Sequence, residues 1–164
     1  MNAYSGIGSR KTPEDILMKF DRIGKILANK GFTLRSGGAD GADSAFEVGC
    51  DKANGKKEIF LPWKGFNGNT SLLFDPPEEA FVMTGKIHPG WHHLKQGARR
   101  LHARNCQQVL GINLDNPVQF VICYTKLDGG GTLQALRIAQ QKKIPIYNFY
   151  LQKYSIKEMI KHTL

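Results

Sequence analysis

Three glycine-rich segments hold the residues of this chain that could do chemistry. They are Gly6-Ile7-Gly8-Ser9-Arg10, Ser36-Gly37-Gly38-Ala39-Asp40-Gly41-Ala42-Asp43 and Asp128-Gly129-Gly130-Gly131-Thr132. Each segment follows a short apolar or β-branched run and precedes a helical pattern, so each is expected to be a strand-to-helix turn. Glycine lets the backbone approach a ligand closely, and the amides at a helix start attract anions. Together the three turns predict a crevice that binds a phosphate.

Side chains in these turns add donors for an anion. Arg10 offers a forked, permanently charged donor, although the first turn alone reads equally well as a corner with a solvated arginine. The third turn favours function, because a simple turn seldom requires three consecutive glycines with their cost in conformational entropy. The residues expected to contact the ligand or its phosphate are Gly6, Gly8, Ser9, Arg10, Ser36, Gly37, Gly38, Ala39, Asp40, Arg104, Asn105, Gly129, Gly130, Gly131 and Thr132.

An acidic stripe follows the second turn. Asp40, Asp43, Glu47 and Asp51 recur at i, i+3, i+7 and i+11, on one side of the expected helix. Acids at a helix start gain about 0.3–1 kcal/mol from the helix dipole, so Asp40 and Asp43 are open to a purely structural interpretation. The functional alternative is contact with sugar hydroxyls or general-base catalysis by Asp43 or Glu47. Asp51 is expected on a solvated face.

A basic helix over residues 91–110 supplies one more candidate. Arg104 lies about 60° around the helix from the core-facing Leu101, which predicts a position at the rim and a role as a phosphate clamp. Arg104 joins Asp43 and Glu47 as the candidate catalytic residues. His102 and Cys106 are spaced i, i+4, but without a third ligand they predict no metal site.

Alternating strands and helices must position these turns. The pattern predicts an α/β fold, a single Rossmann-like, doubly wound parallel sheet of order 3-2-1-4-5 with helices on both faces. The first helix is expected to begin with Thr12 as N-cap and Pro13 in its first turn. An irregular insertion or lid is expected at about 63–90. The expected strands are 2–6, 32–35, 58–61, 118–124 and 145–149, and the expected helices are 13–30, 40–53, 91–110, 132–142 and one opened by the Ser155-x-x-Glu158 capping box.

Composition limits the class of protein and partner. The 164 residues predict one domain, and the net charge of +9 favours a polyanionic or phosphorylated partner, with a merely solvated basic surface as an equal alternative. No apolar run approaches the roughly 20 residues that span a bilayer, and no secretory pattern opens the chain, so a cytoplasmic protein without a membrane partner is expected. The three cysteines lack C-x-x-C spacing, which predicts reduced thiols. No cofactor is predicted.

The motifs resemble those of the SLOG superfamily over residues 2–149. The matching residues are Gly6-x-Gly8-Ser9-Arg10, Ser36-Gly37-Gly38-Ala39-x-Gly41-x-Asp43-x-Ala45, His102-Ala103-Arg104-Asn105 and Gly129-Gly130-Gly131-Thr132. This superfamily includes the single-strand-binding DNA-processing protein DprA and the LOG-type nucleoside-monophosphate phosphoribohydrolases. The resemblance implies a nucleotide-type ligand, Arg104 beside the scissile bond of a LOG-type substrate, and a homodimer or higher homo-oligomer.

The chain departs from the LOG-type signature at two positions. Asp128 stands where its first glycine is expected, and Ala135 where its catalytic glutamate is expected. The first hypothesis is therefore a sensor, carrier or sequestering protein for a nucleotide or a nucleotide-derived ligand, such as a cyclic or ADP-ribose-type compound. The second is a nucleotide N-glycoside hydrolase that uses Asp43 or Glu47. The third is DprA-like binding of single-stranded DNA, with four candidate stacking platforms: Phe60, Trp63, Phe66 and Trp91.

Overall fold

Five parallel strands form the central sheet of the protein. The computed structural model describes residues 1–163. The strands are β1 (Ala3–Gly8), β2 (Thr33–Ser36), β3 (Lys57–Ile59), β4 (Phe120–Tyr124) and β5 (Ile146–Asn148). Their order is β3-β2-β1-β4-β5, and every neighbouring pair is parallel. The predicted order is confirmed, so the turns after β1 and β4 lie at the point where the strand order reverses.

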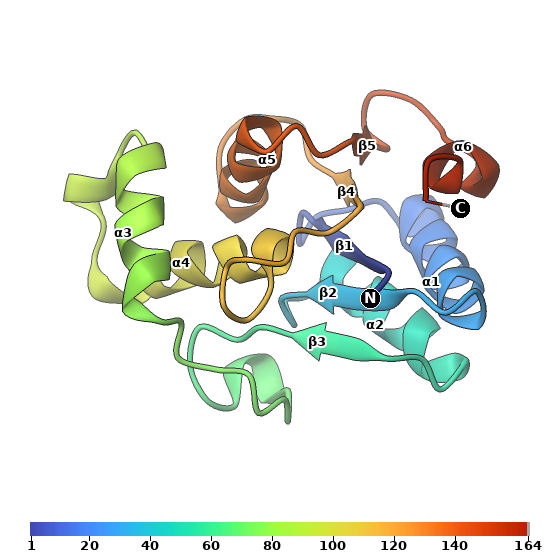
Figure 1. The fold of residues 1–164 in the computed structure, drawn as a ribbon, viewed down its shortest axis with the longest axis horizontal. Coiled ribbons are helices and arrows are strands. Elements are labelled where there is room, and N and C mark those ends of the chain that lie inside the picture. Colours follow the sequence, from blue (N-terminus) through green and yellow to red (C-terminus); the bar gives the residue numbers. More distant parts are fainter. Residues whose placement is uncertain (164) are drawn as a thin grey trace.

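Helices cover both faces of the sheet, as predicted (Figure 1). One face packs against α1 (Glu14–Asn29), α2 (Ala42–Lys52) and α6 (Ile156–Ile160), and the other against α4 (Gln96–Leu110) and α5 (Gly131–Gln141). The helix α3 (Glu78–Ile87) packs on α4 and α5 and not on the sheet. Alternation along β1 divides the two cores, because Tyr4 is buried in the first and Ala3 and Ile7 in the second.

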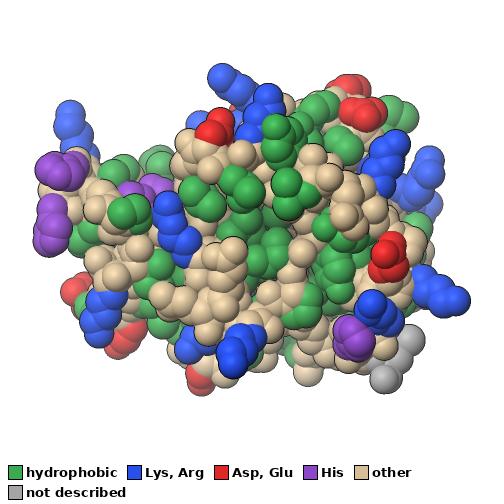
Figure 2. All heavy atoms as spheres, turned by 90° about the horizontal axis from the view of Figure 1, so that it is seen from above, with side chains coloured by type: hydrophobic (Ala, Val, Ile, Leu, Met, Phe, Trp, Pro, Cys, Tyr) green, Lys and Arg blue, Asp and Glu red, His purple; other side chains and the backbone are tan. Residues whose placement is uncertain are grey.

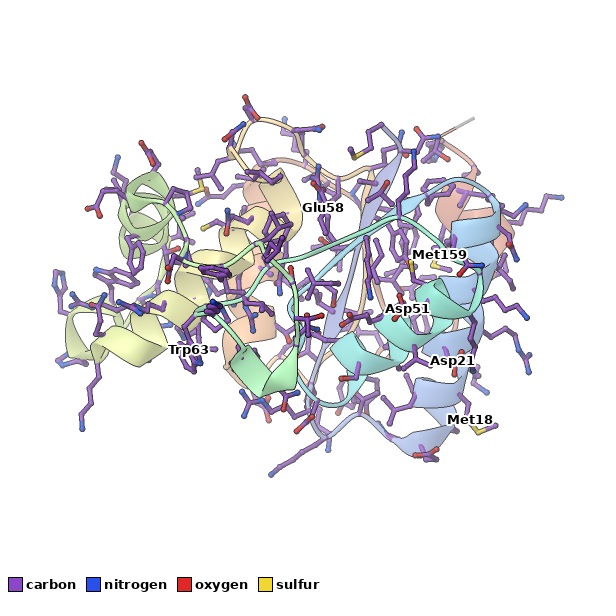
Figure 3. The ribbon with its side chains drawn as sticks, turned by 90° about the horizontal axis from the view of Figure 1, so that it is seen from below. Met18, Asp21, Asp51, Glu58, Trp63 and Met159 are labelled. Carbon is purple, nitrogen blue, oxygen red and sulfur yellow. The ribbon has the colours of Figure 1, made fainter. Side chains whose placement is uncertain are left out.

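Two glycines let α1 and α2 pack with their backbones nearly in contact. A Cβ atom on Gly49 would lie 1.9 Å from the Asp21 carbonyl oxygen, and one on Gly24 would lie 2.7 Å from the Phe46 carbonyl oxygen. Lys52 adds an exposed ion pair of 2.7 Å with Asp21. Figure 3 shows Asp21 on α1 and Asp51 on the neighbouring α2. This contact fixes the middle and the carboxyl end of α2 against α1.

The start of α1 differs from the prediction. Pro13 has an extended ψ of 151° and its carbonyl accepts from the amides of Ile16 and Leu17, so Pro13 is the N-cap. The Thr12 hydroxyl donates to the Ser9 carbonyl at 2.6 Å instead of capping the helix. The assignment of Thr12 as N-cap is wrong because the first glycine turn already uses its hydroxyl. In contrast, the capping box of Ser155 and Glu158 is confirmed.

Residues 63–90 are more regular than predicted. They include the 3₁₀ turn η1 (Phe66–Gly68) and the helix α3, which follows Pro76-Pro77 and has acids in its first turn. A second 3₁₀ turn, η2 (Trp91–His93), precedes α4, which begins at Gln96 and not at Trp91. Leu94 separates η2 from α4 because its ψ of 138° is extended and not helical. The predicted lid at 63–90 therefore contains one 3₁₀ turn and one helix.

Burial protects the three cysteines. Cys50, Cys106 and Cys123 are all buried and free. Desolvation raises the pKa of the Cys50 and Cys106 thiols to about 11 and that of Cys123 to about 12. These thiols are therefore neutral and unreactive at physiological pH.

Residues 1–163 contain neither a membrane-spanning helix nor a metal cluster. Within residues 1–163 every helix falls short of the length and apolar character that crossing a bilayer demands. The same residues contain no group of three or more His, Cys, Asp or Glu side chains arranged to hold a metal ion.

Figure 2 shows Lys and Arg side chains in separate groups on one face of the protein. On that face the basic excess is spread out and does not merge into one track for a nucleic acid.

Candidate ligand-binding pocket

A pocket of about 570 Å³ opens at the carboxyl ends of β1 and β4. Its walls are the turns after these two strands, the start of the turn after β2, and one side of α4. The predicted site residues that line it are Gly8, Ser9, Arg10, Ala39, Asp43, Arg104, Asn105, Gly129, Gly130, Gly131 and Thr132. Three segments far apart in sequence therefore meet at one cavity.

Other predicted site residues support the wall from behind. Gly6 leaves room for Phe46, since a Cβ atom there would lie 2.6 Å from its ring. The Ser36 hydroxyl donates to the Gly6 carbonyl at 2.6 Å and is fully buried. Gly37 lies against Arg104, to which its carbonyl is hydrogen-bonded. These residues position the pocket and do not line it.

Gly38 and Asp40 face the segment that follows β3. The Asn67 side-chain amide donates to the Gly38 carbonyl at 3.1 Å and to the Asp40 carboxylate at 2.9 Å. Asp40 lines a smaller neighbouring cavity and does not line the main pocket. The turn after β2 therefore anchors the 63–69 segment.

Glu47 also lies outside the main pocket. Its carboxylate pairs with Lys57 at 2.9 Å and accepts from the Asn69 side-chain amide at 3.0 Å. Both partners hold the carboxylate one turn farther along α2 than Asp43, outside the cavity. The structure therefore does not bring Glu47 together with Arg104.

Arg104 is buried, which corrects the predicted position at the rim. Only 5% of its surface is exposed, because the turn after β2 and the end of β3 cover it. Its Nη1 donates to the Gly37 carbonyl at 2.5 Å and to the Phe60 carbonyl at 2.9 Å, and its Nε donates to Asn105 Oδ1 at 2.7 Å. Helical spacing gave the direction of this side chain but not the elements that enclose it.

Burial lowers the pKa of Arg104 to about 10, while the charge of Asp43 raises it and that of Arg10 lowers it further. The guanidinium therefore stays charged at neutral pH, close to a second arginine. Two like charges on one cavity repel each other, and an anion between them would relieve that repulsion.

The carboxylate of Asp43 occupies the place that a bound anion would take between the first two glycine turns. Its carboxylate accepts from the amide of Gly8 at 3.2 Å and from that of Ala39 at 3.3 Å. Burial raises the pKa of Asp43 to about 6, although Arg104 and these backbone amides oppose the shift. The expectation that all three turns direct their amides to a ligand is wrong for Gly8 and Ala39, because Asp43 already uses both.

The third turn keeps its amides for a ligand. The first amides of α5, beginning with Gly131 and Thr132, have no acceptor within the helix and lie at the positive end of its dipole. Gly129 and Gly130 reach this helix start with φ of 111° and 87°. The Asn105 side-chain amide donates to the Gly131 carbonyl at 2.8 Å and ties the turn to α4. The start of α5 therefore presents helix amides at the edge of the pocket.

Several lining residues were not predicted from the sequence. Two are cations, Lys11 directly after the first turn and Lys126 directly before the third, and their adjacency to the turns was the available signal. Asp128, at the start of the third turn, lines the pocket as a carboxylate. The remainder form the wall between the turns and α4: Ile7, Ala98, Leu101, His102, Gln108, Tyr124 and Thr125. The pocket thus combines four cations and the carboxylates of Asp43 and Asp128 with an apolar and aromatic wall.

His102 is a neutral wall residue. Its Nδ1 is buried without a hydrogen-bond partner in the part of the chain that the structure describes, and its ring centroid lies 4.4 Å from that of His88. Burial lowers the pKa of His102 to about 4, and the charges of His88, Arg137 and Arg104 lower it further. The imidazole is therefore uncharged at pH 7.

We expect the protein to lose stability relative to a His102→Gln variant as the pH falls from 7 to 5. Unfolded histidine takes up a proton near pH 6.5, whereas the folded side chain stays neutral down to about pH 4, so the unfolded state gains protons first. Since the side chain is partly open to the pocket, we expect a loss of roughly 1 kcal/mol. Urea unfolding at pH 7, 6 and 5 measures it, and parallel pH profiles of the two proteins would contradict it.

Comparisons with known proteins identify the fold. No protein-family model matches the chain, and no curated protein matches its sequence. Among solved structures, the molybdenum cofactor carrier protein of Chlamydomonas reinhardtii is 18% identical, with 99% of this chain and 83% of that chain covered and a TM-score of 0.57. The likeness at this identity is one of fold.

Two DNA-processing proteins share the same architecture. DprA of Helicobacter pylori, described as binding single-stranded DNA, is 18% identical, with 99% of this chain and 72% of that chain covered and a TM-score of 0.60. DprA of Streptococcus pneumoniae is 18% identical, with 99% and 55% covered and a TM-score of 0.59. These neighbours confirm the predicted Rossmann-like fold.

Proposed function

We propose that this protein binds a nucleotide or a nucleotide-derived compound in the main pocket and holds it without cleaving it, as a sensor, carrier or sequestering protein. The observation that carries the proposal is the convergence of Arg10, Lys11, Arg104 and Lys126 on one cavity with the start of α5. About 570 Å³ is a common size for a small-molecule site. The wall that includes Leu101 would face the ring of the ligand.

The placement of the carboxylates favours binding over hydrolysis. Enzymes that cleave glycosidic bonds generally place a pair of carboxyl groups around the scissile bond. Here Asp43 is held by two backbone amides, and Glu47 pairs with Lys57 outside the pocket. Asp128 is the other carboxylate that lines the pocket, and it lies exposed on the third turn. Ala135 is fully buried in the core beneath α5, so this position offers no carboxylate to the cavity. Hydrolysis of an N-glycosidic bond is the weaker alternative.

The similar folds support two kinds of ligand. A carrier of the molybdenum cofactor holds a small molecule, which agrees with the proposed role. The likeness to DprA favours single-stranded DNA as a second candidate. Binding to several phosphates of a strand would weaken steeply with salt, with a log–log slope of about −0.7 per contact. A single small ligand would show a much shallower slope.

Isothermal calorimetry with nucleoside 5′-monophosphates and ADP-ribose tests the proposal. We expect at least one of them to bind at a 1:1 ratio, and an Arg10→Ala variant to bind it about 10- to 100-fold more weakly, since hydrogen bonds to charged groups contribute about 1.5–3 kcal/mol. Arg22→Ala removes the same charge from an exposed site on α1 and is the control. Absence of binding at millimolar ligand would refute the proposal, and chromatography that detects a released base would refute the non-catalytic role.

A further inference from the structure

A second, smaller cavity adjoins the main pocket. It has a volume of about 250 Å³ and is lined by Arg10, Asp40, Trp63, Phe66 and Asn67. Arg10 lines both cavities. A phosphate bound by this arginine would therefore lie where the two cavities meet.

Trp63 is the aromatic side chain of this cavity that remains open. Phe60 is fully buried and Phe66 is 9% exposed, so both belong to the core. Trp91 lies under the guanidinium of Arg99, whose Cζ is 4.8 Å from the ring centroid. Trp63 is 37% exposed and meets Phe66 edge to face, with ring centroids 5.4 Å apart. Of the four candidate platforms, Trp63 has the exposure that stacking requires.

The segment that holds Trp63 is fastened to the turn after β2. Asn67 donates to Gly38 and Asp40, and Asn69 donates to Glu47 from the other end of η1. Figure 3 shows Trp63 on this segment, at the opposite end of the view from Met18 and Met159. Because these bonds fasten the segment to the turn, a ring that stacks on Trp63 meets a platform that is already in place.

Direct contacts join the two cavities. The Arg104 guanidinium carbon lies 5.4 Å from the Phe66 ring centroid, so the floor of the small cavity packs on the main pocket. Gly41 lies so close to the first turn that a Cβ atom there would be 2.6 Å from the Ser9 carbonyl oxygen and 2.8 Å from Arg10 Cα. The position of Arg10 is therefore set relative to both cavities.

We propose that the small cavity is a second ring-binding subsite and that the ligand is of the dinucleotide class. One ring would occupy the main pocket, the connecting phosphate would lie at Arg10, and the second ring would stack on Trp63. Stacking on an aromatic side chain accepts any base, so Trp63 selects for a second ring and not for its identity. This inference rests on the proposed function and further specifies that the ligand carries two rings joined through a phosphate.

The test compares mononucleotides with dinucleotides on the intact protein. Each nucleoside 5′-monophosphate is titrated beside the matching 5′-phosphorylated dinucleotide, pNpN. We expect a dinucleotide to bind about tenfold more tightly, and a Trp63→Ala variant to lose that gain while its affinity for the mononucleotide is unchanged. Trp63→Phe, which retains an aromatic face, should keep most of the gain. Melting temperatures of both variants establish that they are folded.

Fluorescence gives an independent readout. The chain has two tryptophans, so a Trp91→Phe variant leaves Trp63 as the single tryptophan reporter. We expect the dinucleotide, but not the mononucleotide, to quench its emission. Equal affinity for both ligands, or unchanged emission, would overturn the second subsite and leave the proposed function standing.

Two other outcomes separate the hypotheses. If neither ligand binds, the proposed function fails and the second subsite fails with it. If affinity keeps rising from the dinucleotide to a 20-nucleotide single strand, with a slope of about −0.7 per phosphate contact in a log–log salt plot, the dinucleotide class is overturned in favour of single-stranded DNA.

Discussion

Replacing Arg104 by lysine is expected to lower the free energy of unfolding by about 2–4 kcal/mol and to weaken ligand binding at least tenfold. The planar guanidinium bonds to Gly37, Phe60 and Asn105 at the same time. An ammonium group is a point charge and cannot reproduce this fork, so buried acceptors would be left without partners. Arg104→Lys keeps the positive charge, so a loss of stability or of affinity would come from the lost hydrogen-bond geometry of the guanidinium.

Urea unfolding and calorimetry on Arg104→Lys measure these two effects. Arg100→Lys is the matched control, because Arg100 lies on the same helix and is partly exposed. A surface substitution of this kind should change the free energy of unfolding by less than about 0.5 kcal/mol. A similar loss in both variants would mean that α4 as a whole is sensitive to substitution, and the role assigned to Arg104 would be wrong.

Replacing Gly41 by alanine is expected to cost about 2–4 kcal/mol of stability and to abolish detectable binding. Gly41 has φ of 81°, where a Cβ atom is strained, and that atom would also collide with the backbone of Ser9 and Arg10. Because backbone cannot move aside as a side chain can, the first turn must shift away from α2. Arg10 would then leave the junction of the two cavities.

Gly65→Ala isolates the conformational part of this effect. Gly65 has a similar φ of 74°, but a Cβ atom there would meet nothing within 4 Å. We therefore expect about 1 kcal/mol of destabilisation from strain alone, with mononucleotide binding retained. Thermal unfolding and calorimetry on both variants check the difference. Equal stability losses would show that the close approach at Gly41 is unimportant.

Much of the fold could be predicted because its signals are local. A continuous apolar run over residues 118–124 indicates a strand covered on both faces, and β4 is buried along its whole length. Glycine turns after successive strands indicate the carboxyl edge of a parallel sheet, where the pocket lies. The helix α3 was missed because its apolar residues at 80–83 are consecutive and do not mark one helix face, although Pro77 and the acids Glu78 and Glu79 were a usable start signal.

The functions of individual site residues were harder to predict, because they depend on contacts between distant segments. Helical spacing gives the direction of Arg104 around its own axis, but burial comes from the Gly37 turn and from Phe60. Likewise, the position of Asp43 at a helix start does not show that its carboxylate bridges Gly8 and Ala39. In the folded protein Asp43, a candidate general base from the sequence, instead links the first two glycine turns.

The inaccessibility of the native thiols makes the protein a convenient host for a spectroscopic label. Cys50, Cys106 and Cys123 have at most 1% of their surface exposed, so a maleimide dye should leave them unmodified in the folded state. Leu72 is 85% exposed and lies between η1 and α3. A Leu72→Cys substitution would place one fluorophore on the segment that follows η1, without removing any natural cysteine.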